Sequence, residues 1–165
     1  MFDTGKKVWN EFTKWPPKES SKLRFYLNSN GKLEKEKSKN NSYSEYYSDP
    51  NNPVPSSINY IEYNGFTPRN YMSEDQRFAT NRPDVVTFTS DYLTDDITLA
   101  GEIIAKLKIA SSSTDADFIV KLIDIYPADE PQNSDKPEVL YANYHQMVRS
   151  EVMPARFRTS FEKPE

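Results

Sequence analysis

The chain has 165 residues, of which 36% are hydrophobic and 13% aromatic, a composition that favours one folded domain and excludes a disordered chain. Its formal net charge of −4 argues against a nucleic-acid partner, and no apolar run approaches the ~20 residues that span a membrane. With no cysteine, one histidine and four scattered glycines, it lacks disulfides, thiolate metal sites, Gly-rich phosphate loops and the G-x-S-x-G nucleophile elbow.

Residues 1–22 are predicted to form an extended lead-in to a domain at residues 23–165. The lead-in contains Trp9, Phe12 and Trp15, whose rings are expected to pack on another surface. Its first seven residues are polar and lack the apolar segment of a secretion signal. The sequence therefore leaves the compartment of the protein open between periplasm and cytoplasm.

The first predicted strand is Leu23–Leu27. Residues 28–31, Asn-Ser-Asn-Gly, are predicted to form a turn after it, because asparagine and glycine tolerate positive φ. Three prolines within residues 50–55 then exclude a regular central strand. Residues 48–75 are therefore predicted to be a long ordered loop, with one short strand at Ile58–Tyr63.

Three segments with strand-like patterns follow. Residues 76–80 and 84–90 are predicted to be short strands. Residues 97–110 alternate apolar and polar side chains, which predicts a half-buried strand packed on Phe88 or on the apolar residues of the next strand. The residues predicted to face inward are Ile103, Ala105, Leu107 and Ile109.

The end of the chain is predicted to hold two further strands. Residues 118–126 carry apolar side chains on both faces, which predicts a strand covered on both sides. Pro127–Pro137 is an acidic loop, and residues 139–152 are predicted to be the last strand. No segment keeps the helical spacing of apolar residues. The fold class is therefore predicted to be all-β, with a jelly-roll sandwich as the natural closure.

Two places in the chain are candidates for chemistry. Asp115 and Asp117 form a D-x-D pair whose hard oxygens are candidate ligands of Ca²⁺; a turn whose carboxylates accept backbone N–H groups is favoured instead. His145 lies within the last predicted strand without an activated serine beside it, which favours a structural histidine over a catalytic one. No cofactor is expected.

Charged and aromatic residues form two further groups. The predicted ion pairs join Glu74 and Asp75 to Arg77 and Arg82, and Glu151 to Arg156 or Arg158. Six tyrosines lie in one Pro-, Asn- and Ser-rich stretch: Tyr43, Tyr46, Tyr47, Tyr60, Tyr63 and Tyr71. Either these rings pin the loop by packing, or they form a surface that faces a substrate or another domain. The sequence leaves both interpretations open.

Five segments share their motifs and their order with one family. They are SDPNNPVP (48–55), MSEDQRFATNRPDVVTFTSDY (72–92), TLAGEIIAKLK (98–108), TDADFIVKLIDIYP (114–127) and QMVRSEVMPARFRTSFEKP (146–164). Together they resemble the C-terminal non-catalytic domain of the CocE/NonD serine hydrolases. That family includes X-Pro dipeptidyl-peptidases, α-amino-acid ester hydrolases, cocaine esterase and glutaryl 7-aminocephalosporanic acid acylases.

The resemblance implies a galactose-binding-like jelly roll that packs on an α/β-hydrolase domain of the same polypeptide. Residues 1–22 would lead in from that catalytic domain, whose Ser-His-Asp triad lies outside this chain, so no catalytic residue is expected here. The implied substrate is a small acyl compound, amino-acid ester or peptide. The loop after the PVP motif is expected to face the substrate cleft through Ser56, Ile58, Tyr60 and Tyr63.

The sequence departs from the family pattern at its end. Family members continue beyond FEKPE with further strands, so the chain is expected to be a jelly roll without its last strands. Such a sheet exposes an edge or an apolar face, and a second copy of the chain is the partner expected to cover it. The alternative function is a free-standing carbohydrate-binding jelly roll, which would use tyrosine stacking and Ca²⁺ at Asp115 and Asp117.

Overall fold

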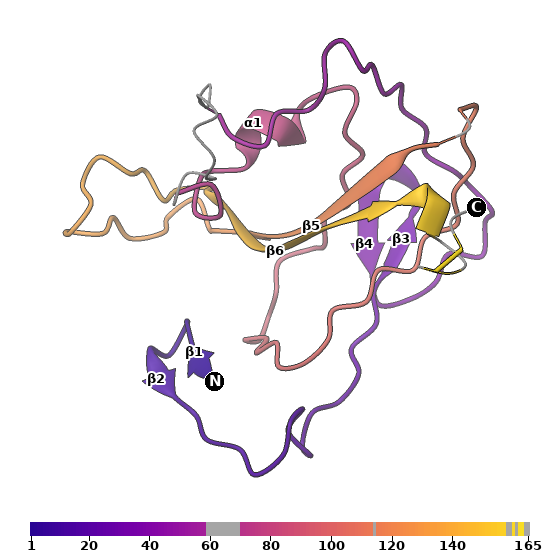
Figure 1. Cartoon of the computed structure of the whole chain (residues 1–165). Coiled ribbons are helices and arrows are strands. Elements are labelled where there is room, and N and C mark those ends of the chain that lie inside the picture. Colours follow the sequence, from indigo (N-terminus) through magenta and orange to yellow (C-terminus); the bar gives the residue numbers. More distant parts are fainter. Residues whose placement is uncertain (59–69, 114, 158–159, 161, 164–165) are drawn as a thin grey trace. The chain divides into compact units, whose positions relative to one another are not determined.

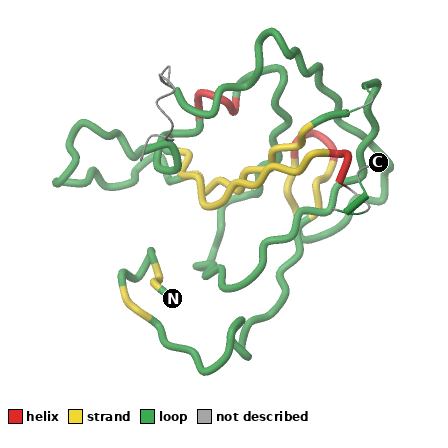
Figure 2. Tube along the Cα trace, in the orientation of Figure 1, coloured by secondary structure: helices red, strands yellow, loops and turns green. Residues whose placement is uncertain are grey.

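The structure, a computed structural model, consists mainly of loops that connect short β-strands (Figures 1 and 2). It describes residues 1–58, 70–113, 115–157, 160 and 162–163. Within these residues the strands form three antiparallel pairs, beside one helical turn and two 3-10 turns. Among the described helices, none has the length and apolar character needed to cross a membrane.

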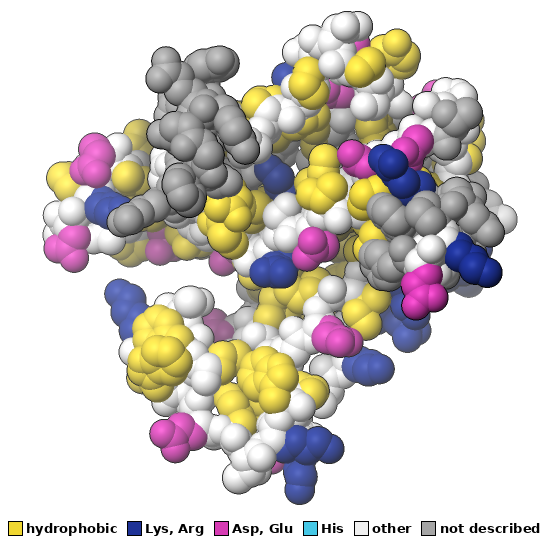
Figure 3. All heavy atoms as spheres, viewed as in Figure 1, with side chains coloured by type: hydrophobic (Ala, Val, Ile, Leu, Met, Phe, Trp, Pro, Cys, Tyr) yellow, Lys and Arg dark blue, Asp and Glu magenta, His cyan; other side chains and the backbone are white. Residues whose placement is uncertain are grey.

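The chain divides into two compact units, Met1–Glu45 with Val86–Lys106 and Tyr46–Val85 with Leu107–Glu165. The first unit begins with a short hairpin in the predicted lead-in. It pairs β1 (Phe2–Asp3) with β2 (Val8–Trp9), and the Phe2 and Trp9 rings lie 5.4 Å apart. Trp9 is 78% exposed, and hydrophobic side chains gather on the surface of this hairpin (Figure 3).

The predicted first strand and its turn both form. The strand is β3 (Tyr26–Asn28), which starts later than predicted and pairs with β4 (Lys32–Glu34). The turn between them, Ser29–Gly31, reaches positive φ at its last two residues. The Gly31 carbonyl then accepts a hydrogen bond from the Thr89 amide (2.8 Å), which docks the second segment of this unit on the hairpin.

Two predicted strands, residues 84–90 and 97–110, do not form. The first is extended and makes one bridge, from Thr89 to Lys32, and the described residues provide no partner strand for the second. An apolar face of an extended segment stays in contact with solvent unless a second layer of structure packs on it. The predicted inward-facing residues are therefore exposed, which corrects the prediction at Ile103, Ala105, Leu107 and Ile109.

The second unit is built on the longest strand pair. The predicted strands at residues 118–126 and 139–152 are found as β5 (Asp117–Ile125) and β6 (His145–Pro154), which are antiparallel with a bulge in the middle. β6 begins later than predicted because the residues before it belong to a loop, in which Asn143 adopts a positive φ of 54°. The loop extends from one end of the strand pair (Figure 1).

The segment QRFAT is a helical turn, α1 (Arg77–Thr80), where the sequence predicted a strand. The Gln76 carbonyl accepts a hydrogen bond from the Ala79 amide (3.1 Å), and the Asp75 carboxylate accepts one from the Arg77 amide (3.0 Å). An Asp side chain that bonds a backbone N–H two residues later competes with extended structure. These local bonds explain why the segment turns.

Most of the buried side chains lie in the second unit, and they are as often polar as apolar. The buried set includes Asn28, Ser57, Gln76, Ala79, Tyr144 and Met147. By contrast, Ile119 and Val152 lie opposite each other on β5 and β6 and are 57% and 50% exposed. The strand pair thus presents an uncovered apolar face, so the prediction that residues 118–126 are covered on both sides is wrong in this structure.

The turn before β4 provides a test of the fold. At Gly31, φ is +69° and an added Cβ would lie 3.0 Å from the Thr87 carbonyl oxygen. Gly31→Ala should therefore lower the free energy of unfolding by about 1–3 kcal/mol, the cost of a strained backbone conformation. Urea unfolding measures this change. Gly5→Ala is the control, because its Cβ meets only an ordinary contact at 3.6 Å, and equal losses in both variants would contradict this turn geometry.

Candidate functional site

The loop predicted to face a substrate cleft is anchored at its beginning. Ser56 is exposed and Ile58 is 62% exposed, whereas Tyr60, Tyr63 and most of the predicted short strand lie outside the described residues. Between the two exposed residues, Ser57 is only 4% exposed. The sequence analysis did not single out Ser57, whose burial depends on a residue 17 positions away.

The group that anchors Ser57 is the Glu74 carboxylate. The Ser57 hydroxyl lies 2.7 Å from both carboxylate oxygens and shares its one proton between them. The Ile58 amide donates to the same carboxylate at 3.2 Å, and the Asn70 side-chain amide donates at 3.1 Å. We call these four residues the neck. The prediction that Glu74 pairs with an arginine is wrong among the described residues, because its carboxylate accepts hydrogen bonds from neutral donors.

Behind the neck, Gln76 connects the loop to both long strands. Its side-chain amide donates to the Glu74 carbonyl (2.8 Å) and accepts from the Lys121 ammonium on β5 (2.7 Å). Its backbone N–H donates to the His145 carbonyl on β6 (3.0 Å). The Lys121 ammonium also lies 5.5 Å from the Phe78 ring centroid, and burial lowers the pKa of Lys121 while Glu74 opposes that shift.

His145 is the first residue of β6, and hydrogen bonds connect it to α1 and to the residues that precede α1. Its amide donates to the Asp75 carboxylate (3.3 Å), and its ring Nδ1 lies 3.1 Å from the Thr80 hydroxyl. That hydroxyl is also 3.1 Å from the Gln76 carbonyl. Among the described residues no carboxylate hydrogen bonds to the ring, so the arrangement lacks the acid that orients a catalytic histidine. The geometry supports a structural role for His145.

Charge around His145 is set by one ion pair. The predicted pair of Asp75 with Arg77 is present, with the Arg77 Nε 2.6 Å from the carboxylate. Burial raises the pKa of Asp75, but hydrogen bonds from Arg77 and from the His145 amide lower it overall. Burial lowers the pKa of His145, Asp75 opposes that shift, and Arg77 adds to it. Both groups are therefore held in the form they have at neutral pH, carboxylate and neutral imidazole.

The other predicted ion pairs form with different partners. Arg82 pairs with Asp84 (2.7 Å) and Glu151 with Arg149 (3.4 Å), because each has an opposite charge two residues away. Arg158 lies outside the described residues.

The predicted D-x-D pair lies at the start of β5. Arg156 pairs with Asp115 (3.1 Å), whose carboxylate also accepts the Ala116 amide (2.9 Å), while Asp117 is exposed in β5 opposite Pro154. In the described part of the chain, no three His, Asp or Glu residues are grouped closely enough to hold a metal ion.

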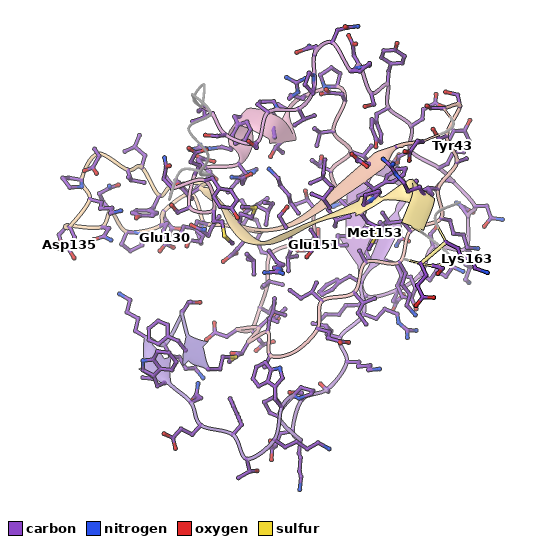
Figure 4. The ribbon with its side chains drawn as sticks, viewed as in Figure 1. Tyr43, Glu130, Asp135, Glu151, Met153 and Lys163 are labelled. Carbon is purple, nitrogen blue, oxygen red and sulfur yellow. The ribbon has the colours of Figure 1, made fainter. Side chains whose placement is uncertain are left out.

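The tyrosines separate into exposed and packed groups. Tyr43 and Tyr47 are 86% and 80% exposed, so neither ring pins its loop by burial. Tyr43 is labelled in Figure 4. A second group, which the sequence analysis did not single out, packs around the start of β6, where the Tyr126, Tyr141 and Tyr144 centroids lie 5.5–6.1 Å apart. The Tyr144 hydroxyl donates to the Ser73 carbonyl, so this group also supports the segment that carries Glu74.

The shifted pKa of His145 makes the stability of the chain depend on pH. The folded-state pKa lies below 6.5, so the unfolded chain binds more protons as the pH falls through 6.5. The free energy of unfolding should be fully retained above that pH and decline below it, and urea unfolding between about pH 5 and 8 measures this. His145 is the only histidine, so His145→Gln should flatten the profile in that range; an unchanged slope would contradict the assignment.

Comparison with known proteins shows what the chain is similar to. A family model for the X-Pro dipeptidyl-peptidase C-terminal non-catalytic domain matches residues 1–165. Cocaine esterase of Rhodococcus sp. (strain MB1 Bresler) is 31% identical over 137 residues, which are 77% of this chain and 23% of that protein.

Two solved structures contain a part similar to the whole chain. An aminopeptidase from the marine sediment archaeon Thaumarchaeota archaeon aligns with a TM-score of 0.88 and 29% identity. An α-amino-acid ester hydrolase aligns with a TM-score of 0.80 and 28% identity. Each alignment covers 99% of this chain and 27% of the other protein, so the chain spans about a quarter of the length of its relatives. These structures confirm the predicted all-β jelly-roll class.

Proposed function

The chain belongs to the CocE/NonD hydrolase family as an X-Pro dipeptidyl-peptidase C-terminal non-catalytic domain, and we propose that it is the accessory domain of a larger serine hydrolase. The parent protein is proposed to cleave ester or amide bonds in a small acyl compound, amino-acid ester or peptide. In this proposal residues 1–22 lead in from the α/β-hydrolase domain, and residues 23–165 form the jelly roll.

The proposal rests on how much of this chain and how much of each relative the alignments cover. The family model and both solved structures account for nearly the whole chain, yet the chain accounts for about a quarter of each relative. The relatives are an esterase, an aminopeptidase and an ester hydrolase, so their names describe hydrolysis of an ester or an amide bond. The ring of His145 faces a threonine, and the described residues give it no carboxylate partner, which supports a nucleophile supplied by another domain.

The neck supports a role for the loop beside the substrate cleft. Substrate-facing residues act best when a rigid scaffold positions them, and here the buried Ser57 holds Ser56 and Ile58 at the surface. Ile58 is 62% exposed and apolar, which suits contact with an acyl or side-chain group of a substrate. We propose that Ser56, Ile58, Tyr60 and Tyr63 form part of the cleft wall in the parent enzyme.

Exposed apolar surfaces support packing against the rest of the parent protein. In the first unit, a shallow hollow is lined by Met1, Trp9, Asn10, Glu11, Phe12 and Trp15. Exposed patches of this kind mark interfaces. We propose that this surface contacts the catalytic domain. In the isolated chain, a second copy is the proposed cover for the Ile119 and Val152 face of β5 and β6.

A labelling experiment tests whether the catalytic serine belongs to another domain of the parent protein. A fluorophosphonate probe, which reacts with activated serines, should leave the 165-residue chain unlabelled, because the His145 ring bonds a threonine and because Ser57, whose hydroxyl bonds the Glu74 carboxylate, is buried. The product of the complete reading frame should be labelled once and should hydrolyse amino-acid esters, acylated β-lactams or X-Pro peptides. Stoichiometric labelling of the 165-residue chain, or a complete product without a reactive serine, would contradict the proposal.

A further inference from the structure

The Glu74 carboxylate accepts hydrogen bonds from two stretches of chain that residues 59–69 separate in the sequence. Ser57 and Ile58 precede residues 59–69, Asn70 follows them, and all three donate to this one carboxylate. The Ser57 oxygen is 2.7 Å from each carboxylate oxygen, the Ile58 amide is 3.2 Å from one, and the Asn70 amide is 3.1 Å from the other. Three donors from two separate stretches of chain therefore depend on one acidic side chain.

We propose that Glu74 is a positioning residue for substrate binding: its carboxylate ties Ile58 to Asn70 and thereby fixes where Ser56 and Ile58 stand. The proposal rests on the proposed function, in which Ser56 and Ile58 face the substrate cleft. Glu74 does not touch the substrate itself. It acts through its hydrogen bonds to Ser57, Ile58 and Asn70, and it changes the affinity for substrate but not the chemical step.

A carboxylate suits this position because all the donors are neutral. Hydrogen bonds to an ionised acceptor are shorter and roughly twice as strong as bonds between neutral groups. Among the described residues, Arg77 bonds Asp75 and the Lys121 ammonium bonds the Gln76 side chain, so neither cation hydrogen bonds to Glu74. The Glu74 carboxylate therefore accepts its hydrogen bonds from Ser57, Ile58 and Asn70.

The neck is also tied to the strands behind it. The Glu74 carbonyl accepts the Gln76 side-chain amide at 2.8 Å, and Gln76 in turn bonds Lys121 of β5 and the His145 carbonyl of β6. The Tyr144 hydroxyl holds the Ser73 carbonyl on the other side of Glu74. The backbone around Glu74 is thus held in place independently of its carboxylate. This preorganises the carboxylate to accept hydrogen bonds from Ser57, Ile58 and Asn70, which lowers the entropy cost of forming those bonds.

Exchanging donor and acceptor across the neck provides the decisive variants. Asn70→Asp places two carboxylates against each other, and Glu74→Gln replaces the charged acceptor by an amide. In the double variant an amide and a carboxylate face each other again with their positions exchanged. Glu138→Gln is the matched control, because Glu138 is an exposed glutamate of the same unit without a hydrogen bond to its side chain.

Two measurements on the full-length protein determine the effects of these variants on the neck and on substrate turnover. Hydrogen–deuterium exchange over the peptide containing Ile58 reports the neck directly, and steady-state kinetics report KM and kcat separately. Each single variant should speed exchange by roughly tenfold, as expected for the loss of one strong hydrogen bond, and raise KM with little change in kcat. The double variant should recover most of both effects, and Glu138→Gln should change neither.

The two readouts distinguish the possible failures. Exchange at Ile58 that stays at the wild-type rate in Asn70→Asp and in Glu74→Gln would overturn the role of Glu74 as the anchor of the neck. Faster exchange with an unchanged KM would instead overturn the position of the loop at the substrate cleft, and the family assignment would stand. A fall in kcat that the double variant does not restore would show general damage to the fold and would also overturn the proposal.

Discussion

The side chain of Gln76 makes the contact on which the second unit depends. It is 2% exposed, and its amide joins the backbone of Glu74 to the ammonium of Lys121, while its own N–H holds His145. A buried polar group left without its partner costs about 1–3 kcal/mol, and more when the partner is charged. Each of these bonds therefore fixes the others, because losing one leaves an unpaired group in a buried place.

This polar centre explains how a chain with a small apolar core positions a loop. In the second unit the buried apolar residues Ala79, Tyr144 and Met147 lie in α1 and around the start of β6. Much of the remaining apolar surface, such as Ile119 and Val152, is exposed on the strand pair. A piece of a larger hydrolase is expected to look like this, since surfaces that pack on other parts of the protein are uncovered when the piece is considered alone.

Local patterns in the sequence were sufficient for part of the fold. The apolar run before Tyr126 predicted β5, and the segment before Asn-Ser-Asn-Gly predicted β3 and its turn, because strand periodicity and turn residues act over few positions. The alternation in residues 97–110 predicted burial wrongly, since a pattern shows which face is apolar but not whether a partner covers it.

The candidate site was harder to predict. The loop at Ser56 was identified by resemblance, but Ser57 and Gln76 were not, because polar residues become buried through distant partners such as Lys121, 45 positions from Gln76. The QRFAT segment became a helix for a similar reason: hydrogen bonds to Asp75 and Gln76 outweigh a pattern of only five residues.

Hydrogen exchange in Gln76→Ala is the most direct test of this account. The account predicts that the amides of Ile58 and Arg77 exchange faster in this variant, because the neck and α1 lose the contact that ties them to the strands. The amide of Leu33, which bonds the Thr89 carbonyl in the other unit at 3.0 Å, should keep its wild-type rate and serves as the internal control. Wild-type exchange at Ile58 and Arg77 would contradict the central place given to Gln76.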